Sequence, residues 1–277
     1  MTEPVRAKRS LGQNFLTDPN IQRKIIGALD PQPDDVILEI GPGLGALTRH
    51  LVGAVKRIVG VELDDELAER LRQEFAGRPD FQLIHGDALE LDLHRLDLPH
   101  GYKAIGNIPY NITTPLLFRL LERDQRPREL IIMVQKEVAA RVTARPGHKD
   151  YGALSVGVQS VARAERLFNV GRGAFRPVPG VDSTVLRITP YDPPPLSAEE
   201  EDDLRMLTRA AFSQRRKQFQ KILRTAPPYL VSGHIIDDLE RTTGLNLDAR
   251  PETFSADEFR ALAQALRGYG LPGRMEP

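Results

Sequence analysis

Short apolar runs alternate with amphipathic stretches through the first two thirds of the chain. The runs with strand length and composition are 36–41, 57–63, 81–87, 102–108 and 129–136. Between them, 44–53, 65–75 and 114–123 carry apolar residues at three- and four-residue steps, which is typical of helices with one buried face. This alternation predicts an α/β fold, in which helices cover both faces of a parallel sheet. Two later runs, 164–170 and 183–190, are expected to complete the sheet in antiparallel orientation.

The pattern changes after residue 190. A proline-rich stretch, "YDPPPL", follows at 191–196, and no strand-like run comes after it. Ser197 with Glu200, and Ser255 with Glu258, have the spacing of a capping box at the start of a helix. The sequence therefore predicts two domains, a catalytic α/β domain over 1–190 and a small helical domain over 191–277.

Composition excludes several classes of function. The chain has no cysteine, and its six histidines show no metal-ligand pairing, so we expect no metal site. No apolar stretch reaches the roughly 20 residues of a membrane helix, and the N-terminus has no signal-peptide core. We therefore expect a cytoplasmic protein that has no membrane partner.

Charge is balanced overall but unevenly distributed. The 38 basic and 38 acidic residues cancel, yet the run 209–224, "RAAFSQRRKQFQKILR", has no acidic residue, and "EEEDD" lies just upstream at 199–203. One interpretation is a helix that complements its own dipole, and the other is a surface for phosphates. On the second interpretation, the candidate RNA contacts are Arg215, Arg216, Lys217 and Lys221.

The first chemical signal is a glycine loop at the end of the first strand. In "LEIGPGLGALT", Gly41, Gly43 and Gly45 lie between a strand and a helix, where a cofactor can approach the backbone closely. The spacing also fits G-x-G-x-x-A with Ala46 in the last place, so a dinucleotide site has to be considered. A plain turn is the structural alternative.

Acidic residues follow at the ends of the next two strands. Glu62 can accept hydrogen bonds from both ribose hydroxyls of an adenosine-containing cofactor. Asp87 can accept from an adenine amino group, or it can cap the following helix. Together with the glycine loop, these residues favour one bound adenosine cofactor.

The fourth strand ends in "NIPY". Asn107 offers a side-chain carbonyl, Ile108 a backbone carbonyl that Pro109 directs outward, and Tyr110 an aromatic plane. These groups suit a flipped-out nucleobase whose ring stacks on tyrosine while its exocyclic amine donates to two neutral acceptors. The alternative is an ordinary turn with a tyrosine in the core.

"NIPY" is similar to the [ND]-[PIL]-P-[YF] signature of S-adenosylmethionine-dependent amino methyltransferases. The whole chain resembles the KsgA-type rRNA adenine N6,N6-dimethyltransferases. The matching stretches are "KRSLGQNFL", "EIGPGLGALT", "VELD", "GDAL", "GNIPYNITTPLLFRLL", "MVQKEVAARVTARPGHKDYGALSV", "FRPVPGVDS" and, in the tail, "AFSQRRKQ". The resemblance implies a Rossmann-like methyltransferase sheet with a small C-terminal helical domain. S-adenosylmethionine would be the methyl donor.

The resemblance also implies roles for individual residues. Asn14 and Leu16 would close over the methionine end of the cofactor, and the Gly41 loop would lie beneath it. Glu62 would hold the ribose, Asp87 the adenine amine, and Asn107 would lie between cofactor and target. Phe175 would flank the target base opposite Tyr110.

The implied substrate is a pair of adjacent adenosines in the 3′-terminal hairpin loop of small-subunit rRNA, within an immature subunit. The implied product is N6,N6-dimethyladenosine. We expect the enzyme to be a monomer. The tail departs from the family pattern at Gln218, Phe219 and Gln220, where a more aliphatic run is expected. This departure concerns the RNA surface and leaves the expected active site unchanged.

Three alternatives remain at the level of sequence. A nicotinamide dehydrogenase would use the same glycine loop and Glu62, but it has no use for "NIPY". A noncatalytic RNA-binding assembly factor would keep the basic tail and tolerate loss of Glu62 and Asn107. A large-subunit rRNA methyltransferase of the antibiotic-resistance type shares the catalytic motifs, but "FLTDPNI" and "GHKDYGALSV" are closer to the small-subunit group.

Overall fold

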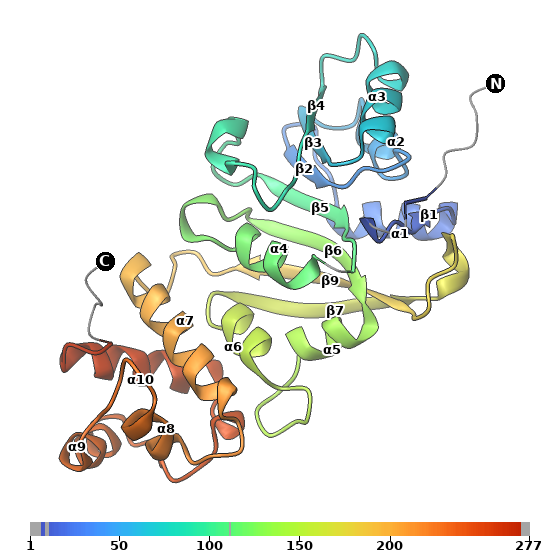
Figure 1. Ribbon diagram of the computed structural model, residues 1–277. Coiled ribbons are helices and arrows are strands. Elements are labelled where there is room, and N and C mark those ends of the chain that lie inside the picture. The colour runs from blue at the N-terminus through green and yellow to red at the C-terminus, as the bar shows by residue number, and fades with distance from the viewer. Residues whose placement is uncertain (1–6, 9–10, 111, 273–277) are drawn as a thin grey trace. The chain divides into compact units, whose positions relative to one another are not determined.

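The computed structural model describes residues 7–8, 11–110 and 112–272 (Figure 1). The chain divides into two compact units. One contains the residues up to 139 together with 164–190, and the other contains 140–163 together with the residues from 191 onward. The segment 140–163, assigned to the first domain by sequence, thus belongs with the helical unit. The roles of the units in catalysis and RNA binding stay predictions.

The strands are β1 Phe15–Leu16, β2 Val36–Ile40, β3 Arg57–Glu62, β4 Phe81–His85, β5 Lys103–Asn107, β6 Glu129–Gln135, β7 Ala162–Val170, β8 Phe175–Arg176 and β9 Ser183–Pro190. The helices are α1 Pro19–Leu29, α2 Thr48–Leu51, α3 Asp65–Glu74, α4 Thr113–Leu120, α5 Lys136–Val142, α6 Ala153–Gln159, α7 Ala198–Ser213, α8 Phe219–Thr225, α9 Gly233–Thr243 and α10 Ala256–Gly268. Short 3-10 turns connect several of them.

The main sheet has seven strands in the order β4-β3-β2-β5-β6-β9-β7. Strands β2 to β6 are parallel to their neighbours, and β9 is antiparallel to β6. This arrangement confirms the α/β fold and the late antiparallel strand. A second, two-stranded sheet pairs β1 with β8, and strands of two residues are too short to leave a periodic pattern in the sequence.

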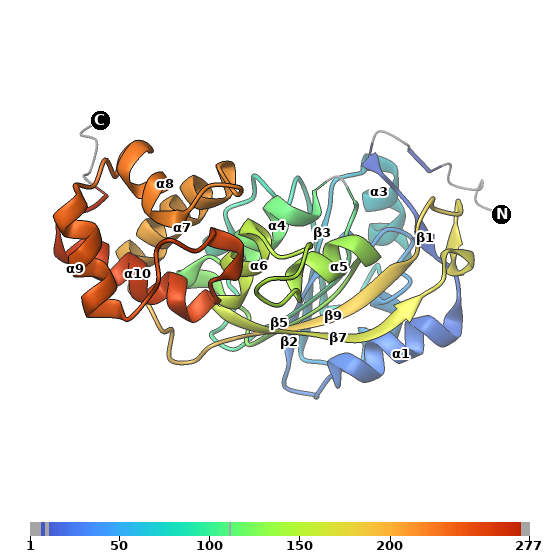
Figure 2. The same cartoon turned by 90° about the horizontal axis from the view of Figure 1, so that it is seen from below.

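Helices cover both faces of the seven-stranded sheet. Figure 2 shows α1 beneath the sheet and α4 above it. On the α1 side, Ile25 and Leu29 pack in one buried cluster with strand residues such as Ile37, Ile105 and Ile131. Because parallel strands are buried on both faces, they appear in the sequence as nearly continuous apolar runs.

The helix expected over 44–53 is much shorter in the structure. Only α2, Thr48–Leu51, is helical, and turns precede it. Gly41, Gly43 and Gly45 have φ angles of 63°, 60° and 74°. These left-handed conformations are readily adopted by glycine and delay the start of the helix.

The helical unit has its own core, which contains Phe219, Phe254 and Phe259. Both predicted capping boxes are present, at the starts of α7 and α10. The basic run is not one helix, because α7 ends at Ser213 and α8 begins at Phe219. The last turn of α7 contains no basic residue, so the interpretation that the run complements this helix's dipole is wrong.

Candidate active site

The ends of β2, β3 and β5 lie side by side at one edge of the sheet. Ile40 is in register with Val61 on one side and with Gly106 on the other. The chain leaves β2 towards β3 and later returns on the opposite side of β2 as β5. Ligands of α/β sheets bind outside the strand ends at such a switch point.

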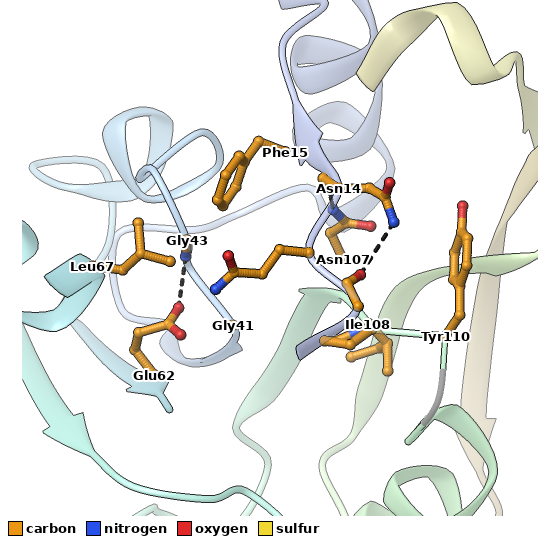
Figure 3. Close-up of a pocket in the computed structure, with 12 residues that line it drawn as sticks. Asn14, Phe15, Gly41, Gly43, Glu62, Leu67, Asn107, Ile108 and Tyr110 are labelled. Atoms are coloured by element: carbon orange, nitrogen blue, oxygen red, sulfur yellow. Dashed lines mark hydrogen bonds between the residues drawn. The ribbon is translucent and has the colours of Figure 1, made fainter. Parts of the chain in front are cut away.

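Two pockets open at this edge. One is lined by Gly12, Gln13, Asn14, Phe15, Gly41, Gly43, Glu62, Leu67, Asn107, Ile108, Pro109 and Tyr110 (Figure 3). The other is lined by Leu11, Gln13, Ile40, Gly41, Val61, Glu62, Leu63, Gly86, Asp87, Ala88, Pro109 and Ile112. They share Gln13, Gly41, Glu62 and Pro109, so an elongated ligand can extend from one to the other.

Glu62 holds the floor of this site in place. Its Oε2 accepts a hydrogen bond from Gly43 N at 2.9 Å (Figure 3). Its Oε1 accepts from Asp64 N at 3.0 Å. Burial raises the pKa of the carboxyl, and the bonds from these two amides oppose the shift. A carboxylate has further lone pairs, so it can still accept from ribose hydroxyls.

The three glycines of the loop differ in what surrounds them. Gly41 and Gly43 line the first pocket. Gly45 does not line the described pockets, and a Cβ there would meet Leu71 and Phe75 at 3.4 and 3.5 Å. Leu71 of α3 and Phe75 thus pack beside Gly45, and its role as a cofactor contact stays a prediction.

The segment before α1 covers the first pocket. Asn14 and Phe15 line it, and Leu16 lines a smaller neighbouring pocket. The segment is attached to the start of α3, where Asp64 accepts from Lys8 Nζ at 2.7 Å and from Gln13 Nε2 at 2.8 Å. The structure thus brings Asn14 and Leu16 to the Gly41 loop, as the sequence predicted.

Asn107 connects this covering segment to the "NIPY" stretch. Its Nδ2 donates to the carbonyl oxygen of Asn14 at 2.9 Å, as the dashed line in Figure 3 shows. This bond orients the side-chain amide of Asn107. Its Oδ1 remains available to accept a hydrogen bond from a ligand. Ile108 is fixed in turn by its backbone amide, which donates to Met133 O at 3.1 Å.

Tyr110 lies beside Asn107 and Ile108 at the rim of the pocket (Figure 3). Its hydroxyl is 3.0 Å from Ser183 Oγ. The ring is neither fully exposed nor fully buried. It therefore lines a pocket instead of filling the core.

Phe175 does not occupy the expected position. Its side chain is fully buried in the cluster that contains Ile25, Leu29 and Val185, and it lines none of the described pockets. The expectation that it flanks the target base opposite Tyr110 is corrected for this conformation, because its ring has no exposed face. Its backbone instead pairs β8 with Leu16 of β1.

Asp87 does not cap a helix, because turn residues follow it at 88–90, and its contact with an adenine amine stays a prediction. It lines the second pocket, and its Oδ1 accepts from Leu89 N at 2.8 Å. Ile40, Val61 and Leu63 provide apolar surface in the same pocket. Apolar walls with two carboxylates, Asp87 and Glu62, suit an adenosine whose amino group and ribose hydroxyls donate hydrogen bonds, so the residues present fit an adenosine cofactor.

Glu39 is a buried acid that the sequence analysis did not single out. It is 1% exposed, and its Oε2 accepts from Thr48 Oγ1 at 2.8 Å. It lines the smaller pocket together with Gly41 and Asn107. A charged residue within the apolar strand "VILEI" was the available signal. Gln13 and Phe15 were also missed, although they lie within a quoted motif.

The RNA candidates differ in their surroundings. Arg215 pairs with Glu252 and donates to Lys149 O at 3.0 Å, so the fold uses its guanidinium. Arg216, Lys217 and Lys221 are exposed.

Among the described residues, no helix is long and apolar enough to cross a membrane. No cluster of three or more acids and histidines that could hold a metal occurs in the same part of the chain.

The burial of Glu39 predicts a pH-dependent stability. Burial raises the pKa of its carboxyl from 4.5 to about 7, the Thr48 bond opposes the shift, and the charge of Glu62 adds to it. The folded protein therefore keeps a proton that the unfolded chain loses, and stability present below pH 4.5 is lost as the pH rises to 7. We expect the free energy of unfolding of the cofactor-free protein to fall by up to about 3 kcal/mol over this range.

Urea unfolding at a series of pH values measures this effect. Glu39→Gln keeps an acceptor for Thr48 and should remove the Glu39 contribution to the pH dependence. Glu39 is not the source of the pH dependence if the variant and the wild-type protein lose stability in parallel between pH 4.5 and 7.

Comparison with known proteins places this geometry in a family. The sequence model of ribosomal RNA adenine dimethylase matches residues 5–264. A ribosomal RNA small subunit methyltransferase A from Geobacter metallireducens is 43% identical over 271 residues, covering 97% of this chain and 98% of its own. A protein of the same name from Pseudomonas syringae is 41% identical over 262 residues, covering 94% and 95%.

Solved structures agree with the sequence relatives. A dimethyladenosine transferase from Plasmodium falciparum is similar with a TM-score of 0.77 and 25% identity, over 92% of this chain and 98% of its own. The 23S rRNA methyltransferase ErmE is similar with a TM-score of 0.69 and 26% identity, over 92% and 100%. The family match spans most of the chain, so this protein belongs to the ribosomal RNA adenine dimethylase family.

Proposed function

We propose that this enzyme transfers methyl groups from S-adenosylmethionine to N6 of two adjacent adenosines in the 3′-terminal hairpin loop of small-subunit rRNA. Its products would be N6,N6-dimethyladenosines, and its substrate an immature small subunit. The proposed setting is the cytoplasm, with the enzyme acting as a monomer. The observation that carries the proposal is the Asn107 amide, whose NH2 group is held by Asn14 so that its carbonyl oxygen can accept from an amine.

The sequence relatives support the choice of subunit. Full-length relatives at 41–43% identity are named for the small subunit, whereas the 23S rRNA enzyme is 26% identical. Its TM-score of 0.69 indicates that both groups share the fold. The fold alone therefore does not choose between them. A nicotinamide dehydrogenase is excluded by membership of the family.

The residues of the site act by position. S-adenosylmethionine, when bound, supplies an electrophilic methyl group whose leaving group is neutral. Glu62 and Asp87, which line the same pocket, would accept from the ribose and the adenine amine of this cofactor. Asn107 Oδ1 and the Ile108 carbonyl would accept from the target amine and favour a pyramidal nitrogen. Tyr110 would stack on the base and stabilise the cation that develops.

Two methylations are compatible with such a site. A monomethylated amine keeps one N–H that can donate to an acceptor of the site. It can therefore bind there again once the C6–N6 bond has rotated its methyl group away from the acceptors. The reaction needs no titrating base at the amine, since solvent can take the proton after transfer. The substrate can therefore be dimethylated without a second set of groups.

The decisive test of substrate is incubation with labelled S-adenosylmethionine and either unmodified small subunits or unmodified large subunits. We expect label only in the small-subunit rRNA, at two adjacent adenosines near its 3′ end, as dimethyladenosine. Nuclease mapping of the labelled RNA locates the sites. Label in large-subunit rRNA instead would overturn the proposal in favour of the resistance-type activity.

Asn107 separates catalysis from binding. Asn107→Ala removes an acceptor that matters most when the target nitrogen gains positive charge, so it should slow single-turnover methylation by about 10²-fold or more. Cofactor and RNA affinities should change little. Asn107→Asp keeps an acceptor but loses the bond to Asn14 O, so its rate should fall between those of alanine and the wild type. Equal wild-type rates for both variants would remove the role assigned to this residue.

The exposed basic side chains of the helical unit are proposed RNA contacts. Replacing Arg216, Lys217 and Lys221 with glutamine should weaken RNA binding and reduce its salt dependence by up to about three phosphate contacts. A control triple variant at Lys56, Arg72 and Arg95 makes the same change in net charge at other exposed positions. Binding isotherms at several salt concentrations compare the two, and equal effects would contradict a localised RNA surface.

A further inference from the structure

The hydroxyl of Tyr110 contacts a residue far away in the sequence. Tyr110 lies in the turn after β5, and its hydroxyl is 3.0 Å from Ser183 Oγ at the start of β9. Neither the "NIPY" signature nor the stacking role requires this contact. A ring that only stacks needs no hydroxyl, and the signature itself accepts phenylalanine.

Ser183 is a fixed point of the fold. It is fully buried, and it lies opposite Gln135 where β9 pairs with β6. The preceding residue, Asp182, is held on both sides: its carbonyl accepts from Lys136 N at 3.0 Å and its Oδ1 from Arg172 N at 3.1 Å. The Ser183 hydroxyl is therefore anchored by the central sheet.

Tyr110 has much less support of its own. It lies outside the strands and helices, and its neighbourhood is held by the turn in which Ile112 N donates to Pro109 O at 3.2 Å. Burial raises the pKa of the phenol, although the bond to Ser183 opposes the shift, so the hydroxyl is neutral and can both donate and accept. The contact with Ser183 limits the rotation of a ring that otherwise faces an open pocket.

We propose that Ser183 is a positioning residue, whose hydroxyl holds the ring of Tyr110 in the plane on which the target adenine stacks. The proposal rests on the function proposed above, in which Tyr110 receives the base. It explains why this position carries a tyrosine instead of a phenylalanine. Ser183 itself touches neither the base nor the cofactor.

The test is a double-mutant cycle measured by single-turnover methylation. Tyr110→Phe and Ser183→Ala each remove one half of the contact and should each slow the reaction by about fivefold, the effect of one neutral hydrogen bond. The double variant should be no slower than either single variant, because the same contact is lost in all three. Cofactor affinity by calorimetry should stay unchanged, and Ser183→Thr, which keeps the hydroxyl, should recover activity.

Thr184→Val is the matched control. Thr184 is the next residue of β9, is also fully buried, and donates its hydroxyl to Asn169 Oδ1 at 2.9 Å, away from Tyr110. We expect it to lower the melting temperature as Ser183→Ala does, with methylation at the wild-type rate. If Thr184→Val slows methylation as much as Ser183→Ala, or if the effects of the double variant add, the proposal is wrong.

Tyr110→Ala separates this proposal from the one on which it rests. If it methylates at the wild-type rate, the stacking role of Tyr110 fails, and the role of Ser183 fails with it. If it is slow while Tyr110→Phe and Ser183→Ala are as fast as the wild-type protein, stacking stands and only the positioning role of Ser183 is overturned.

Discussion

The site depends on one carboxylate that accepts hydrogen bonds from two backbone amides. Glu62 joins the glycine loop after β2 to the turn after β3, through Gly43 N and Asp64 N. Asp64 in turn binds the covering segment through Lys8 and Gln13. Because buried amides need acceptors, loss of this carboxylate would affect the pocket floor and its cover together.

The strand pattern allowed the sheet to be predicted because burial on both faces leaves continuous apolar runs. Glu62, Asp87 and Asn107 could be located at the strand ends for the same reason, since each lies at or near the end of such a run. Phe175 was misplaced because motif membership does not distinguish a residue that lines a pocket from one that packs behind it. Phe175 is buried in one cluster with Ile25 and Leu29, which lie far from it in the sequence, and no local pattern reports such packing.

The basic run illustrates a different limit. A run of like charges does not indicate where a helix ends. The break between α7, which ends at Ser213, and α8, which begins at Phe219, changes which side chains are exposed. Arg215 forms an ion pair with Glu252, which lies outside the basic run and later in the sequence. Composition could indicate an RNA surface, but it could not identify the arginine that the fold uses.

The pairing of β1 with β8 has a consequence for how the protein is made. Leu16 lies opposite Phe175, so the segment that covers the pocket has its strand partner about 160 residues later in the chain. Domains are generally completed from the N-terminus during synthesis. The covering segment of a nascent chain therefore lacks this strand partner until residues 175 and 176 have left the ribosome, and the pocket is complete only when nearly the whole of the first unit is present.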